Sequence, residues 1–99
     1  METAEIRFDP GTVVMTKGIA GLDKEHHTEL LECLSRHLIG DWGDLCDDDR
    51  QMNDESIEAE KNGEMCDRLM SVYETDFGTV WIITEWDRSA TTILLPEEY

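Results

Sequence analysis

The chain has 99 residues and carries 24 acidic against 8 basic side chains, which gives a formal net charge of −16. Because nucleic acids and anionic membrane surfaces repel such a protein, this balance argues against direct binding to DNA, RNA or a membrane, and a charged partner is expected to be basic. The length predicts a single small acidic domain, residues 1–99, with one modest hydrophobic core.

Targeting signals and disulfides are not expected. The N-terminal sequence METAEIRFDPGTVVMTKG lacks the basic start and long apolar run of a secretory signal, and no stretch approaches the roughly 20 apolar residues that cross a bilayer. The three cysteines, Cys33, Cys46 and Cys66, are widely spaced and odd in number, which suits reduced thiols better than a disulfide framework. These features predict a cytoplasmic protein.

The first elements expected are an arm and a short strand. Residues 1–10 are expected to form a loosely held N-terminal arm, followed by a turn in the sequence DPG. The β-branched run TVVMT at 12–16 is typical of a strand, and Gly18 and Gly21 are expected to interrupt regular structure after it.

The strongest helix pattern follows, at residues 23–40. Asp23 is suited to cap the N-terminus, and Gly40 occupies the usual position after the last turn. Apolar residues recur at helical spacing and predict a buried stripe of Leu30, Leu31, Leu34 and Leu38.

A second helix is predicted at 47–62. Asp47 or Asp48 can cap it, and its apolar stripe, Met52, Ser56 and Ala59, is weak. Such a helix is expected to lie on the surface and to depend on the rest of the domain for its stability.

The last third of the chain is typical of strands. The runs MCDRLMSVYET and TVWIITEW are separated by the loop DFG, in which Gly78 takes the left-handed position, and TTILLP follows the polar turn DRSA and ends at Pro96. Strands joined by short turns form an antiparallel meander, to which 12–16 can add a fourth strand. We therefore predict an α+β fold: an antiparallel three- to four-stranded sheet packed with one main helix and a second, acidic surface helix.

Half of the net charge lies in a fifth of the chain. Residues 41–60 contain nine acidic side chains and one basic residue, Arg50. In a helix, residues four apart are about 6 Å apart along the axis, and the phosphates of a nucleic-acid strand follow one another at about 3.4 Å. A helical carboxylate face is thus suited to fill a basic groove built for nucleic acid. The expected partner-binding residues are Asp47, Asp48, Asp49, Asp54, Glu55, Glu58 and Trp42.

Two other interpretations of the acidic segment stay open. One is a solvated acidic helix without a partner, in which the charge serves solubility. The other is calcium binding by DWGDLCDDD, although this run lacks the central glycine and closing glutamate of an EF-hand loop.

Three tryptophans are the large aromatic anchors of the chain. Trp81 is expected in the core, and Trp86 is expected to be partly exposed at the end of a strand. Trp42, held between Gly40 and Gly43, either closes one end of the core or supplies an aromatic contact beside the acidic surface.

A zinc-stabilised regulatory domain is the alternative function. Cys33 and His37 lie four residues apart on one flank of the first predicted helix, Cys46 follows the next turn, and Cys66 begins a strand. If the fold gathers all four, they form a Cys₃His zinc site. The other interpretation is that the cysteines are core residues and that His37 interacts with the last carbonyls of its helix.

Catalytic residues are not predicted. Glu85, Asp87 and Arg88 lie at a turn between strands, where they serve either acid–base chemistry or the structure of the turn. Cys46 is a further nucleophile, but no Cys–His pair has a recognisable orienting residue or oxyanion donor. We therefore expect a protein that is not an enzyme.

The segments RHLIGDWGDL, MSVYETDFGT and WIITEWDRSATTILLPEEY resemble a family of short, largely uncharacterised proteins of bacterial plasmids and phages. The resemblance covers residues 10–99 and implies a mobile genetic element as the source; it implies no catalytic residues. Small acidic proteins of such elements often inhibit host defence by occupying nucleic-acid grooves. Charge and resemblance together predict a non-enzymatic inhibitor, an anti-CRISPR protein that binds the basic surface of a CRISPR effector nuclease, or of another DNA-handling defence protein, and blocks DNA binding.

Overall fold

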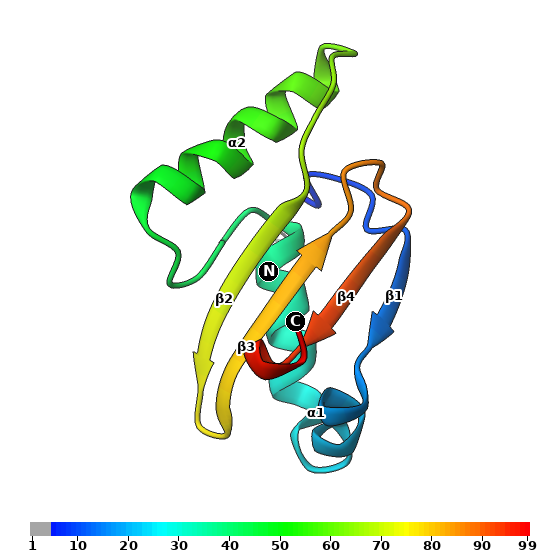
Figure 1. Cartoon of the computed structure of the whole chain (residues 1–99), viewed down its shortest axis with the longest axis vertical. Coiled ribbons are helices and arrows are strands. Elements are labelled where there is room, and N and C mark those ends of the chain that lie inside the picture. The colour runs from blue at the N-terminus through cyan, green and yellow to red at the C-terminus, as the bar shows by residue number, and fades with distance from the viewer. Residues whose placement is uncertain (1–4) are drawn as a thin grey trace.

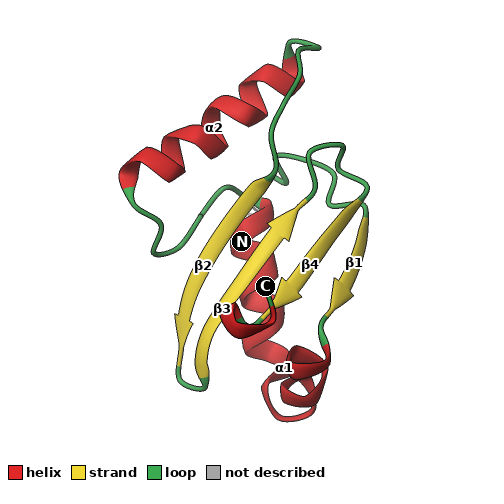
Figure 2. Cartoon of the chain, in the orientation of Figure 1, coloured by secondary structure: helices red, strands yellow, loops and turns green. Residues whose placement is uncertain are grey.

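The computed structural model describes residues 5–99, which form a four-stranded sheet and two α-helices (Figure 1 and Figure 2). This arrangement confirms the predicted α+β class. Within residues 5–99, no helix is long and apolar enough to cross a membrane. The elements in chain order are β1 (Thr12–Met15), α1 (Lys17–Leu38), α2 (Asp47–Lys61), β2 (Leu69–Thr75), β3 (Gly78–Thr84), β4 (Ala90–Leu94) and the 3-10 helix η1 (Pro96–Glu98).

The strand order is β1-β4-β3-β2, and β2, β3 and β4 form the predicted antiparallel meander. The β2–β3 hairpin closes at the pair Thr75 and Gly78, where Gly78 has the predicted positive φ, 124°. The sheet is not antiparallel throughout, because β1 pairs with β4 in parallel. The chain leaves β1 through two helices and re-enters the sheet at its far edge, so the meander brings β4 back beside β1 in the same direction.

Helix α1 covers one face of the sheet and begins earlier than predicted, at Lys17 instead of Asp23. Its first turn contains no acidic residue, and its N-cap, Thr16, makes no capping bond with its own side chain. The carboxylate of Glu98 fills this role, since it accepts hydrogen bonds from the Gly18 amide, at 2.8 Å, and from the Thr16 hydroxyl. The helix is kinked at His26 and ends as predicted before Gly40, whose φ is +85°.

The core lies between α1 and the sheet. Of the predicted leucine stripe, Leu30 is buried and Leu34 and Leu38 are partly buried, whereas Leu31 is 49% exposed. A second, smaller cluster joins the N-terminal arm and α2 to β2. The main cluster is Ile19, Leu30, Cys33, Tyr73, Val80, Ile82 and Ile93, and the second is Phe8, Trp42, Ile57 and Leu69.

The expected loose arm, 1–10, is attached to the domain over the part that the structure describes. Phe8 is buried in the second cluster, and the Arg7 amide donates to the Leu38 carbonyl at 2.8 Å. The Pro10 carbonyl accepts a hydrogen bond from the Thr91 hydroxyl at 2.7 Å. Residues 1–4 lie outside the described residues.

Helix α2 lies beside the beginning of the edge strand β2 (Figure 1). Its buried residues are Asn53, Ser56 and Ile57, so the predicted stripe is correct at Ser56 and wrong at Met52 and Ala59. The sequence pattern fails here because the contact is mostly polar: two of the three buried side chains bind backbone groups beside the edge strand. The outer edge of β2 is thereby covered at Met70, and at Val72 it pairs with the turn before α2.

Candidate functional site

Helix α2 presents the predicted acidic surface. The first turn contains Asp47, Asp48 and Asp49, where the N-terminal end of the helix dipole favours negative charge. The N-cap is the backbone of Cys46 and not, as predicted, Asp47 or Asp48. Six carboxylates of α2 are exposed: Asp47, Asp48, Asp49, Asp54, Glu55 and Glu58. The sequence prediction is therefore correct about which residues reach solvent.

Asp54 has a structural role that distinguishes it from the other five. Its Oδ1 accepts a hydrogen bond from the indole Nε1 of Trp42 at 3.0 Å and from Arg7 at 3.2 Å. Removal of this carboxylate would leave the partly buried Trp42 N–H without an acceptor. A test of binding by charge reversal should therefore leave Asp54 unchanged.

Trp42 is buried, and its predicted role as a contact for a partner is wrong. Only 4% of its surface is exposed, because it packs between Phe8 and His37 with ring centroids 6.2 Å and 5.5 Å away. The turn that places it depends on Gly43, whose φ is +74° and whose Cβ, if present, would lie 1.9 Å from the Val72 carbonyl oxygen. Of the two interpretations of Trp42, the structure supports closure of the core.

The positive charges near α2 are used within the fold. Arg50, the one basic residue of the acidic segment, donates to the carbonyl groups of Gly43 and Leu45 and closes the turn before the helix. Arg88 is buried and binds Glu60 at 2.9 Å. Among residues 5–99, four carboxylates of the helix form no salt bridge: Asp47, Asp48, Asp49 and Glu55. Their charge is available to a partner.

The predicted zinc ligands are not brought together. Cys33 belongs to α1 and faces the core, where burial raises the pKa of its thiol. Cys46 is exposed, and the Cys66 thiol donates to the Trp86 carbonyl at 3.2 Å. Over the described part of the chain, no group of three or more His, Cys, Asp or Glu side chains is placed to hold a metal ion. Because these residues do not fit a zinc ion as they stand, zinc binding stays a prediction without geometric support.

His37 is the centre of a buried chain of hydrogen bonds. The Thr91 hydroxyl donates to a carbonyl, so the Thr84 hydroxyl must donate to Thr91, and His37 Nε2–H must donate to Thr84, at 2.9 Å. The other ring nitrogen, Nδ1, then accepts from the Ser71 hydroxyl. Both nitrogens of His37 are thus occupied, and burial, with a smaller effect of the Arg88 charge, lowers the pKa of His37 to about 3.

The turn residues proposed for acid–base chemistry hold the turn together. Asp87 accepts from the Ser89 amide at 3.0 Å, and hydrogen bonds from Ser89 lower the pKa of this exposed carboxyl. Arg88 has a left-handed φ of 59°, and its guanidinium donates to the carbonyl groups of Asp67 and Glu85. These contacts are structural.

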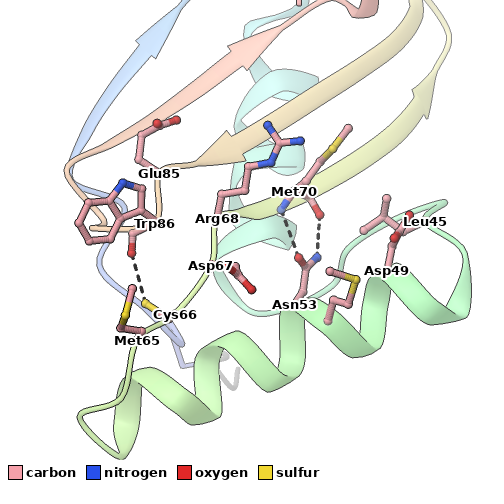
Figure 3. Close-up of a pocket in the computed structure, with 11 residues that line it drawn as sticks. Leu45, Asp49, Asn53, Met65, Cys66, Asp67, Arg68, Met70, Glu85 and Trp86 are labelled. Atoms are coloured by element: carbon pink, nitrogen blue, oxygen red, sulfur yellow. Dashed lines mark hydrogen bonds between the residues drawn. The ribbon is translucent and has the colours of Figure 1, made fainter.

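An apolar groove beside α2 was not predicted from the sequence (Figure 3). It has a volume of about 790 Å³ and lies between α2, the segment 65–68, Met70 of β2 and the β3–β4 turn. Met70 points to the sheet face opposite α1, because its neighbours Leu69 and Ser71 are fully buried in the core. The residues that line it are Leu45, Asp49, Met52, Asn53, Met65, Cys66, Asp67, Arg68, Met70, Glu85 and Trp86. The sign of this groove in the sequence is weak: three methionines, Met52, Met65 and Met70, that follow no regular spacing.

No protein-family model, curated protein or solved structure matches this chain. The resemblance to plasmid and phage proteins therefore stays a prediction, and the proposals below depend on the surface itself.

Proposed function

We propose that this protein is a non-enzymatic inhibitor that binds a basic, nucleic-acid-handling surface of another protein. The observation that carries the proposal is the exposed row of carboxylates on α2, four of which form no salt bridge within residues 5–99. The first target class to test is the CRISPR effector nucleases, for which the protein would be an anti-CRISPR protein of the host cytoplasm. Restriction endonucleases are the next class.

The shape of the row supports this choice of partner. Asp47 and Glu58 are eleven residues apart on one helix, which corresponds to about 16 Å along the axis. One nucleic-acid strand places about five phosphates over that length. A rigid convex helix with this charge density can lie in a groove whose lysines and arginines otherwise bind phosphates.

The test is capture by purified proteins of each class, at low and at high salt. Wild-type protein should bind at least one nuclease, and binding should weaken as salt rises, because exposed charge pairs are screened over about 8–10 Å at physiological ionic strength. Basic proteins that do not handle nucleic acid serve as the control. Equal binding to the nucleases and to that control would contradict the proposal, and absence of binding to any nuclease would favour a solvated acidic helix.

A further inference from the structure

The groove beside α2 exposes large apolar side chains from three separate segments. The exposed fraction is 58% for Met52 on α2, 93% for Met65 in the segment after it, and 61% for Trp86 in the β3–β4 turn. Three of the five methionines of the chain line this one groove. Apolar patches with a polar rim mark interaction sites on soluble proteins, and methionine adapts its shape to varied apolar ligands.

The backbone around the groove is held in place. The buried Arg88 guanidinium donates to the Asp67 carbonyl at 2.8 Å and to the Trp86 carbonyl at 3.4 Å, which joins two walls of the groove. Asn53 fixes a third wall through hydrogen bonds with the backbone of Met70. The frame is therefore rigid, which lowers the entropic cost of binding.

The rim of the groove is negatively charged. Asp49, Asp67 and Glu85 are exposed and form no salt bridge within the described residues. The one cation of the lining, Arg68, donates to the Tyr99 hydroxyl at 2.6 Å. This charge pattern matches a basic ligand and opposes an acidic one.

The groove and the acidic helix adjoin. Met52 has Asp48 four residues before it and Glu55 three residues after it, so both carboxylates neighbour it on the helix surface. An apolar side chain in the groove would bring flanking lysines or arginines against these two carboxylates. The two surfaces can thus bind one segment at the same time.

We propose that this groove receives a large aliphatic or aromatic side chain from a basic segment of the partner. This inference rests on the proposed function, since it takes the partner to be basic, and it adds an apolar requirement that the acidic helix alone does not impose. The partner chemistry is that of an amphipathic segment in which lysine or arginine flanks leucine, phenylalanine or methionine.

The test uses two synthetic helical peptides of equal charge, each about five turns long (~18 residues). One has lysines on one face and leucines on the other, and its matched control has serine in place of every leucine. Isothermal titration calorimetry measures both against four proteins: wild type, the groove variant Met52→Ser/Met65→Ser/Trp86→Ser, the remote control Leu31→Ser, and a variant with reversed charges on α2. Circular dichroism checks each fold, and Met65→Ser and Trp86→Ser alone replace the triple variant if it unfolds.

Wild type and the Leu31→Ser control should bind the leucine peptide at least about tenfold more tightly than the serine peptide. The groove variant should lose this difference and keep its affinity for the serine peptide, whereas charge reversal on α2 should weaken both. Equal affinity of wild type for the two peptides would overturn the groove proposal but would not contradict the proposal that the partner is basic. Failure of wild type to bind either peptide at low salt would overturn both the groove proposal and the proposal of a basic partner.

Discussion

The side-chain amide of Asn53 binds both backbone groups of Met70: its Nδ2 donates to the carbonyl at 2.7 Å, and its Oδ1 accepts from the amide at 3.4 Å. One turn further along α2, Ser56 binds the backbone of Asp67 in the same two-way manner. The helix that presents the acidic surface is therefore attached to the sheet chiefly through polar contacts with an edge. Its position depends on a few specific side chains.

Replacement of Asn53 by alanine should loosen this attachment. Asn53→Ala leaves the outward backbone groups of Met70 without their partner and should lower the free energy of unfolding by about 1–3 kcal/mol. Urea denaturation measures the change. Gln51→Ala, on the exposed side of the same helix, is the matched control and should stay within about 0.5 kcal/mol of wild type. Equal effects of the two substitutions would show that Asn53 does not hold α2 against β2.

Two glycines of α1 should respond differently to alanine. A Cβ at Gly21 meets no atom within 4 Å, so Gly21→Ala should stabilise the helix by about 1 kcal/mol. A Cβ at Gly18 would lie 2.7 Å from the Leu95 side chain and 2.8 Å from a carboxylate oxygen of Glu98, and it would displace the cap. Loss of a cap costs about 1 kcal/mol, so Gly18→Ala should be clearly less stable than Gly21→Ala in thermal unfolding.

The cap predicts a specific coupling between Gly18 and Glu98. In a Glu98→Ala background, Gly18→Ala has no cap left to displace and should therefore cost less than it does in wild type. Only its contact with the Leu95 side chain should then separate it from Gly21→Ala. If Gly18→Ala is equally damaging with and without the Glu98 carboxylate, the explanation through the cap fails.

His37 should make the protein less stable as pH falls below neutrality. Its pKa is lowered from an ordinary 6.5 to about 3, so between these values the unfolded chain binds a proton that the folded protein does not. The contribution of His37 to the free energy of unfolding is at its full value above pH 6.5 and should be about 2 kcal/mol smaller at pH 5. The difference in unfolding free energy between wild type and His37→Gln should shrink by that amount from pH 7 to pH 5. In NMR spectra, titration of the His37 ring over this range would contradict the prediction.

Chelation should leave the melting temperature unchanged. The hydrogen-bond chain through Thr84 and Ser71 occupies both ring nitrogens of His37, so this residue has no lone pair free to bind zinc. Elemental analysis and thermal unfolding with and without EDTA check this expectation. A stoichiometric zinc ion together with a lower melting temperature after chelation would favour the predicted Cys33, His37, Cys46 and Cys66 site.

The sequence predicts the features that depend on local pattern. Gly40 ends α1 and Gly78 closes the hairpin because both turns need a positive φ that glycine adopts readily. The meander follows from short turns between β-branched runs. The exposure of the acidic residues on α2 follows from the cost of burying unpaired carboxylates.

The features that the sequence does not reveal depend on residues far apart in the chain. The start of α1 is set by Glu98, eighty residues after Gly18. The burial of Trp42 depends on Phe8, which the pattern assigns to a loose arm. The groove joins Met52, Met65 and Trp86 from three segments whose proximity only the fold establishes. Periodicity within one element carries no information about such contacts.

The central claim is that α2 binds where a target protein binds nucleic acid, and competition tests it most directly. The measurement is the inhibition of DNA or RNA binding by a captured nuclease, with wild type and two charge variants of equal net charge. One variant reverses Asp47, Asp48, Glu55 and Glu58 to lysine; the other reverses the exposed Glu25, Glu29, Glu32 and Asp76, outside α2. Wild type and the second variant should displace the nucleic acid, and the first should fail while keeping a native circular dichroism spectrum. Equal inhibition by the two variants would contradict the claim.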